Sequence, residues 1–303
     1  MEEFFYRHDC PTVIRAVGED VEDYLQSQWS IDLRKLNTGS VRFGLRLSLK
    51  GKVLAGAHLA RLHEEEFLLI TEKMAPGDLK GMLEENVVAD EVEFFDESQE
   101  WECFSLKMTE PEPLLAQLGK TKLGFAEFLH LQDGLFFSDR RMSGAGYSAI
   151  LKKESSAIEK ISEGLPDISE AEYNYLRMKE RNYSIPQEVG PDDLPQEAGL
   201  EKSAVDFTKG CYLGQEVMAR LHAMGKVQRE FITIRWENES LIPPTLPATV
   251  IFEKKNVGQL KSLVKYQGNW LGVAKIHLKV KEQAAKSGLS LEDASMGRII
   301  SYD

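Results

Sequence analysis

The chain has 303 residues, of which 42% are hydrophobic and 28% are charged, as is typical of a folded domain protein. One small core is too little for this length, so two or three subdomains are expected. The net charge of −12 disfavours broad binding to nucleic acid, because neutralising phosphates requires clustered lysine and arginine. It leaves open a local basic patch, or a small anionic ligand held by a few arginines.

The three cysteines, Cys10, Cys103 and Cys211, are odd in number and far apart in the sequence. This pattern disfavours a disulfide framework and a cysteine-rich zinc site, so we predict no metal site and a reducing compartment, the cytoplasm. The N-terminus opens with acidic residues and lacks the features of a signal or transit peptide. No apolar run approaches the roughly 18 residues that a membrane-spanning helix needs.

Hydrophobic periodicity and turn residues predict the elements of the first two thirds of the chain. In chain order they are a helix at 20–29, a hairpin of strands 41–49 and 52–62, a strand at 67–71, a helix at 78–85, strands at 91–95 and 101–108, a helix at 113–118, strands at 134–138 and 147–151, and a helix at 169–177. Strands and helices interleave without a regular β-α-β period. This order favours an α+β fold over a doubly wound sheet.

The last part of the chain has a different pattern. Short β-rich segments at 231–236, 248–252, 257–264 and 270–277 are separated by turn residues. We therefore predict a small C-terminal β-barrel or sandwich that begins near residue 227. The expected division is an α+β region at 1–226 and a β-barrel at 227–303.

The densest group of reactive and backbone-permissive residues is Lys-Gly-Cys-Tyr-Leu-Gly-Gln-Glu at 209–216. The pattern predicts a loop that turns into a helix near Gln215, with Cys211 just before the helix N-terminus and Lys209 two residues away. A helix N-terminus and a nearby cation both stabilise a thiolate, so they would lower the pKa of the thiol. The alternative is that Cys211 is a small buried hydrophobic residue and the glycines are caps.

A second informative string, Leu-Pro-Gln-Glu-Ala-Gly-Leu, occupies residues 194–200. It places the Glu197 carboxylate between a rigid proline and a flexible glycine. A carboxylate can accept two hydrogen bonds from a flat N–H/NH2 edge such as that of a pterin. The alternative is that Glu197 caps a helix or stabilises a loop.

Together these strings resemble the YgfZ-type folate-binding proteins. That group is related to the glycine cleavage T-protein, an aminomethyltransferase, and to the mitochondrial assembly factor for [4Fe–4S] proteins. Weaker similarity extends along the chain, at 25–32, 50–53, 257–262 and 272–274. The resemblance implies a fold like that of the T-protein, GcvT: two intertwined α+β subdomains and a small C-terminal β-barrel around a central opening that receives tetrahydrofolate or a one-carbon derivative.

The resemblance also implies roles for individual residues. Glu197 matches the glutamate that contacts the pterin, and Cys211 matches the motif cysteine, the catalytic candidate. The further candidates for binding the cofactor are Lys209, Tyr212, Gln215, Glu216, Arg220, Arg177 and Arg229. The catalytic aspartate of the transferases has no evident counterpart in the segment 69–76. Whether the chain is an enzyme therefore stays open.

Three functions are compatible with this sequence. The first is a tetrahydrofolate-binding accessory protein that supports assembly or repair of [4Fe–4S] proteins, with indirect effects on tRNA modification. Its expected partners are folate and iron–sulfur client or assembly proteins, with no membrane and no direct nucleic-acid partner. The alternative is a folate-dependent aminomethyl transferase. The third is RNA binding through a local patch of Lys209, Arg220, Lys226 and Arg229.

Overall fold

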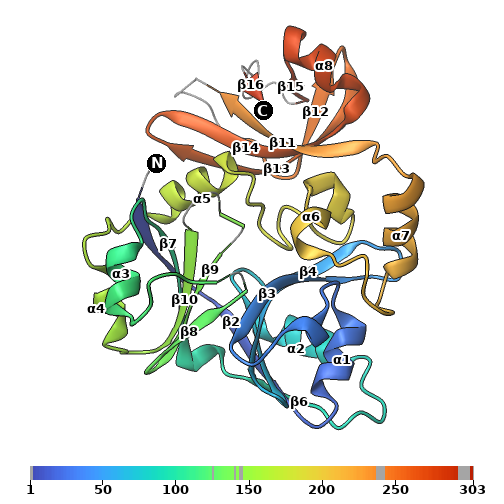
Figure 1. Cartoon of the computed structure of the whole chain (residues 1–303). Helices are drawn as coiled ribbons and strands as arrows, with labels where there is room; N and C mark the ends of the chain where they lie inside the picture. Colours follow the sequence, from blue (N-terminus) through green and yellow to red (C-terminus); the bar gives the residue numbers. More distant parts are fainter. Residues whose placement is uncertain are drawn as a thin grey trace.

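The computed structural model describes residues 3–124, 126–139, 141–142, 146–236, 243–292 and 301–302. These residues form three antiparallel sheets, and helices cover or connect them (Figure 1). Among the described residues, no helix is both long enough and apolar enough to cross a bilayer.

The first sheet has the strand order β1-β7-β10-β9-β8. Helices α3 and α4 pack on it through Leu115 and Ile161, which join a buried cluster with Phe104 and Phe136. The elements of this unit are β1 (Phe4–His8), β7 (Trp101–Lys107), α3 (Glu112–Gln117), β8 (Phe128–Leu131), β9 (Gly134–Ser138), β10 (Gly146–Lys152) and α4 (Ala157–Ser162).

The second sheet has the strand order β3-β4-β5-β2-β6. Helices α1 and α2 cover one face of it, where Leu25, Leu79 and Leu83 are buried against Trp29 and Phe67. The elements are β2 (Thr12–Val17), α1 (Val21–Gln28), η1 (Leu33–Lys35), β3 (Ser40–Leu47), β4 (Val53–His63), β5 (Glu66–Thr71), α2 (Pro76–Glu84), β6 (Glu93–Asp96) and η2 (Ser98–Glu100).

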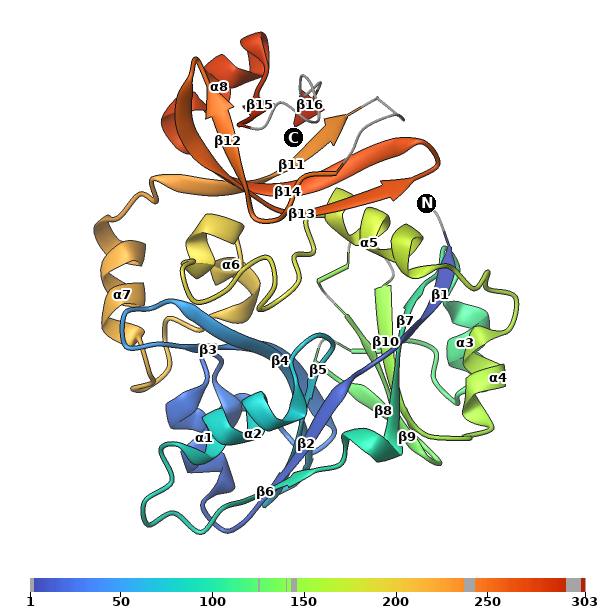
Figure 2. The ribbon, with the colours of Figure 1, turned by 180° about the vertical axis from the view of Figure 1, so that it is seen from behind.

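The chain begins in the first sheet with β1, builds the whole second sheet from β2 to β6, and returns to the first sheet with β7. The first two units are thus intertwined, which confirms the α+β class and the arrangement that the resemblance implied. Figure 2 shows β1 running directly into β2 across the two sheets.

The third sheet is formed by the C-terminal strands in the order β15-β12-β13-β14-β11-β16. Ile232, Val250, Leu260 and Ile276 are buried at its core. The elements are β11 (Arg229–Trp236), β12 (Ala248–Phe252), β13 (Lys255–Tyr266), β14 (Asn269–His277), α8 (Leu278–Ser287), β15 (Ser290–Leu291) and β16 (Ser301–Tyr302). Closure of this sheet into a barrel and the domain boundary at residue 226 stay predictions.

The connecting segment lies between the C-terminal sheet and the two other sheets (Figure 1). Its elements are α5 (Glu170–Lys179), η3 (Pro195–Ala198), α6 (Glu201–Ala204) and α7 (Gln215–Met224). A buried cluster combines Leu47 of the second sheet, Met178 and Met218 of this segment, and Phe231 and Val273 of the C-terminal sheet. This shared core joins the second sheet to the C-terminal sheet through the connecting segment.

Candidate functional site

A cleft lies where strands β3 and β4 of the second sheet approach β9 of the first. It has two adjoining hollows that share the side chains Phe43, His58, Phe137 and Arg141. The inner hollow has a volume of about 30 Å³, which is enough for ordered water but not for a ring. The outer hollow, of about 250 Å³, is near the lower end of the volumes of small-molecule sites.

Three charged side chains meet at the junction of the hollows: Asp139 is buried, and Arg141 and Glu72 are half-buried. Arg141 Nη2 lies 2.5 Å from Glu72 Oε1 and 3.0 Å from Asp139 Oδ2. Burial alone would raise the pKa of Glu72, but the positive charge of Arg141 outweighs it and lowers the pKa to about 2. Burial also opposes ionisation of Asp139, whose pKa Arg141 and His58 nevertheless hold well below the usual range. Both carboxylates therefore remain ionised at neutral pH.

Aromatic rings form the wall between the two hollows. The ring centroid of His58 lies 5.2 Å from that of Phe43 and 5.0 Å from that of Phe137. The Arg141 guanidinium lies 4.6 Å from the Phe43 centroid, within the range of a cation–π contact. His58 Nε2 is also 3.5 Å from Asp139 Oδ1, which holds the imidazole in place. The wall thus combines the faces and edges of mutually inclined rings, at 64° and 60°, and charge pairing fixes its His58 and Arg141 members.

The outer hollow is lined by cations. Arg42, Arg141 and Lys202 are among its lining residues, and the described part of that lining includes no aspartate or glutamate. This is notable in a chain whose net charge is −12. Arg141 is neutralised by Glu72 and Asp139, so the attraction for an anion comes from Arg42 and Lys202 at the outer side of the hollow. The outer hollow therefore suits a ligand that combines a flat ring with a negative group.

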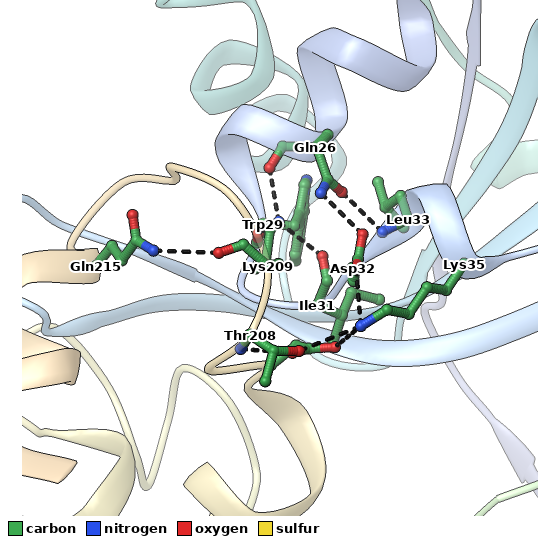
Figure 3. Close-up of polar contacts among 10 residues, drawn as sticks. Gln26, Trp29, Ile31, Asp32, Leu33, Lys35, Thr208, Lys209 and Gln215 are labelled. Atoms are coloured by element: carbon green, nitrogen blue, oxygen red, sulfur yellow. Dashed lines mark hydrogen bonds and ion pairs between the residues drawn. The ribbon is translucent and has the colours of Figure 1, made fainter. Parts of the chain in front are cut away.

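The motif loop is held against the end of helix α1 by a buried lysine. Lys209 Nζ donates hydrogen bonds to the carbonyl oxygens of Gln26, Trp29 and Ile31 at 2.7, 2.6 and 2.7 Å (Figure 3). Burial lowers the pKa of Lys209 to about 8. These three acceptors use all the donors of the ammonium group. The Lys209 side chain therefore anchors the motif loop to the last turn of α1 and the residues that follow it, and does not extend toward solvent.

Further contacts strengthen this anchor. Lys35 Nζ lies 3.0 Å from Asp32 Oδ2 (Figure 3). It also lies 3.2 Å from Asp206 Oδ2, so it bridges the two segments. The backbone amide of Leu213 donates to the carbonyl of Ser27 at 3.1 Å. The early segment 25–32 and the motif 209–216, which the sequence analysis singled out separately, thus form one structural unit.

The turn at residues 50–52 is the third part of this unit. Gly214 has φ +81°, and a Cβ there would lie 2.6 Å from the carbonyl oxygen of Ser48. Gly51 has φ +71°, and a Cβ there would lie 3.0 Å from the side chain of Val217. A side chain at Gly214 would therefore collide with the backbone of the 50–52 turn, and the left-handed backbone favours glycine at both positions.

Comparisons with known proteins show which proteins this chain resembles. No family model matches the chain. The tRNA-modifying protein YgfZ of Colwellia psychrerythraea is 26% identical over 238 residues, which cover 75% of this chain and 69% of that protein. The human mitochondrial iron–sulfur cluster assembly factor IBA57 is 46% identical over 44 residues, or 14% of this chain and 12% of that protein.

A solved structure extends the similarity to the whole fold. The glycine cleavage system aminomethyltransferase T from Bartonella henselae superposes with a TM-score of 0.77 over 98% of this chain and 84% of that one, at 16% identity. The chain has a GcvT-like fold and resembles the YgfZ-type proteins in sequence. The resemblance stated from its two motifs is confirmed, and so is the GcvT-like fold.

The YgfZ/GcvT-like chain exposes its motif cysteine. Cys211 is exposed in the loop, four residues before α7 begins at Gln215. Glu216 and Arg220 are exposed on α7, and Tyr212 is buried beside Lys209, whose Nζ is 5.1 Å from the ring centroid. Burial raises the pKa of Tyr212 to about 12. The loop therefore presents the sulfur to solvent on a rigidly anchored support, and the catalytic role of Cys211 stays a prediction.

The other predicted residues are dispersed in this YgfZ/GcvT-like fold. Glu197 is buried, accepts from the Leu194 amide at 2.8 Å and lies 3.7 Å from Lys275 Nζ. Arg177 lines the inner hollow and pairs with Glu188 at 2.8 Å, whereas Arg229 is exposed at the start of β11. Of the described residues that line the cleft, only Arg177 had been predicted from sequence. The predicted cofactor contacts of the others stay predictions.

Sequence reasoning missed the charged and aromatic core of the cleft: Phe43, His58, Glu72, Asp139 and Arg141. No sequence pattern singles out His58, although it lines both hollows. One sequence pattern could have indicated the site: Asp139 and Arg141 lie directly after the predicted strand 134–138. Charged residues at a strand end near a Gly-rich segment are common at binding sites, since loops carry function.

Proposed function

We propose that this protein binds tetrahydrofolate or a one-carbon derivative in the cleft between the first two sheets, and that it supports assembly or repair of [4Fe–4S] proteins. Effects on tRNA modification would follow indirectly. The observation that carries the folate proposal is the lining of the outer hollow: aromatic walls with Arg42, Arg141 and Lys202, and no acidic residue among its described members.

The chemistry of this lining suits a folate. The pterin is a flat ring that can lie against Phe43, His58 or Phe137, since aromatic faces favour offset stacking. The glutamate tail is anionic and would pair with Arg42 or Lys202 near the surface. Arg141 is already held by Glu72 and Asp139, so it contributes mainly to the shape and charge of the wall.

The proposed role in iron–sulfur proteins rests on the named relatives. Proteins called tRNA-modifying protein YgfZ and iron–sulfur cluster assembly factor IBA57 are both similar to this chain. The exposed position of Cys211 supports contact with iron–sulfur client or assembly proteins, because a thiol must be accessible to react with or ligate a partner's group.

The alternative, aminomethyl transfer, has less support. In the segment 69–76 the acidic side chain is Glu72, and it is paired with Arg141. A carboxylate whose pKa is lowered to about 2 is a weak base, poorly suited to take up a proton at neutral pH.

The proposed cellular role can be tested with two exposed cysteines as a matched pair. A strain that lacks this protein would be supplied with the wild type, Cys211→Ser or Cys10→Ser, and the activity of a [4Fe–4S] enzyme would be measured under oxidative stress. We expect Cys211→Ser to leave the activity at the level of the empty vector, while Cys10→Ser restores it. Equal restoration by both variants, at equal protein levels, would show that the proposed role of Cys211 is wrong.

A further inference from the structure

A groove separate from the cleft lies between the first sheet and the hairpin of β13 and β14. Two adjoining hollows of about 800 and 300 Å³ form it, and both are lined by Glu3 and Glu110. The larger hollow extends to Tyr266 and Gln267 at the tip of the hairpin, which Figure 1 shows near the start of β1. No described residue lines both this groove and the cleft.

The lining of the larger hollow includes an unpaired strand edge. Residues 166–168 extend the first sheet, since the Phe5 amide donates to the carbonyl of Pro166 at 2.8 Å and the Ile168 amide donates to the carbonyl of Phe5 at 3.1 Å. Asp167, between them, forms a parallel bridge with Phe5. In this pattern the N–H and C=O groups of Asp167 point away from β1, and neither bonds to another backbone group of the described chain. Such an edge can pair with the backbone of another extended segment.

The same hollow is negatively charged. Its lining includes the carboxylates of Glu3, Glu110, Asp167 and Glu172, and its described members include no lysine, arginine or histidine. Glu3, Glu110 and Asp167 are exposed, so a ligand in the groove can reach them. Carboxylates gathered along a groove attract a segment that carries lysine or arginine, and they disfavour an acidic one.

The smaller hollow adds an apolar pocket between α3 and α4. Its apolar lining consists of Met108, Pro113, Leu114, Ile161 and Leu165. Lys160 also lines it, but its Nζ already donates to the carbonyl of Gln117 at 2.8 Å. Pockets of this kind accept a single apolar side chain, which anchors an extended peptide on a protein surface. The groove therefore combines an open strand edge, a row of carboxylates and one apolar anchor position.

We propose that this groove binds a basic, extended segment of a partner protein, which adds a strand beside residues 166–168. The backbone of the segment pairs with the N–H and C=O groups of Asp167, and its lysines or arginines lie against Glu110 and Glu172. An apolar side chain of the segment enters the pocket between α3 and α4. A polyamine would supply only the charge, because it has no peptide groups for the strand edge. The groove is separate from the cleft, so this proposal does not depend on folate binding.

Fluorescence anisotropy of a labelled peptide, Lys-Leu-Lys-Leu-Lys-Leu, tests this proposal with the full chain at low ionic strength. Two comparison peptides carry N-methyl groups on the leucine amides or on the lysine amides, so each loses the backbone donors of one strand edge. We expect the unmodified peptide to bind, and one of the methylated peptides to bind about 10-fold more weakly. Equal affinity of all three peptides would show that charge alone attracts them, and would overturn the strand pairing.

Matched variants place the binding in this groove. Asp167→Pro removes both the carboxylate and the unpaired N–H, whereas Asp167→Ala removes only the carboxylate, so the proline variant should bind the peptide more weakly than the alanine variant. Glu110→Lys reverses an exposed charge, and we expect it to weaken binding about 10-fold, with a smaller effect at high salt. It also serves as the test if Asp167→Pro does not fold, as judged by its thermal transition.

The control is Glu64→Lys, which makes the same charge reversal on the exposed turn between β4 and β5. It should change the affinity by no more than about 2-fold. Absence of peptide binding by the wild type, or equal losses in Glu110→Lys and Glu64→Lys, would overturn the proposal.

Discussion

Replacement of Arg141 by methionine is expected to lower the free energy of unfolding by about 3–5 kcal/mol, because it leaves the buried Asp139 and the half-buried Glu72 without their cation. Glu72 and Asp139 both contact the guanidinium, and the Asp139 side chain is 1% exposed. Methionine retains much of the aliphatic packing against Phe43, so the loss reports chiefly on charge. Urea unfolding at pH 7 measures the change.

The pH dependence of the free energy of unfolding provides a second test of this prediction. The pKa of Glu72 is lowered in the folded protein from its usual 4.5 to about 2. In the wild type, the ionised carboxylate therefore contributes stability that is present above pH 4.5 and is lost as the pH falls toward 2. The variant lacks this contribution, so the difference between the two proteins should shrink between pH 7 and pH 3.

The control is Arg34→Met, which removes an exposed arginine paired with the exposed Asp23. Exposed ion pairs contribute little to stability, so the unfolding midpoint should not move. The account of the buried charges would be wrong if Arg141→Met cost less than about 1 kcal/mol at pH 7, or if its effect were the same at pH 3.

Replacement of Lys209 by methionine is expected to have a comparable effect, about 3–5 kcal/mol. Three carbonyl oxygens, of Gln26, Trp29 and Ile31, would lose their shared donor. Hydrogen bonds to a charged group contribute about 1.5–3 kcal/mol each, and water that enters as the loop loosens would offset part of the loss. The variant should therefore loosen the motif loop as well as lower stability.

Hydrogen–deuterium exchange distinguishes local loosening from general instability. The amides of Leu213 and Asp206, which donate to the carbonyls of Ser27 and Ser30, should exchange faster in Lys209→Met. Amides of β13 in the C-terminal sheet should change less. Lys279→Met, at an exposed lysine, is the control. Equal stability and equal exchange rates in Lys209→Met and Lys279→Met would show that the hydrogen bonds from Lys209 to the three carbonyl oxygens do not anchor the loop.

Local sequence patterns predicted much of the fold. The hairpin at 41–49 and 52–62 and the helix at 20–29 agree closely with β3, β4 and α1, because a local turn at 50–51 and the helical spacing of Val21, Tyr24 and Leu25 define them. Strands β1 and β2 were missed. They are short, and their partners are distant in sequence, as in the pairing of Tyr6 with Ser105. Helix α8 was also missed, since its many charges obscure the apolar face.

The candidate site was harder to predict, because tertiary packing assembles it. His58 on β4 and Arg141 after β9 meet only when the two intertwined sheets pack together. The motif showed where Lys209 lies but not where its ammonium points. The sequence placed it near Cys211, whereas the fold turns it into the carbonyls after α1, where buried acceptors need a donor. Motif spacing thus locates a loop but does not define its contacts.

Calorimetric titration of the purified protein with tetrahydrofolate tests the central claim most directly. The wild type should bind with a single site. Lys202→Glu, which reverses an exposed charge at the outer hollow, should weaken binding by about 10-fold or more, and Lys279→Glu should not. Absence of binding by the wild type, or equal affinity of all three proteins, would contradict a folate site in this cleft.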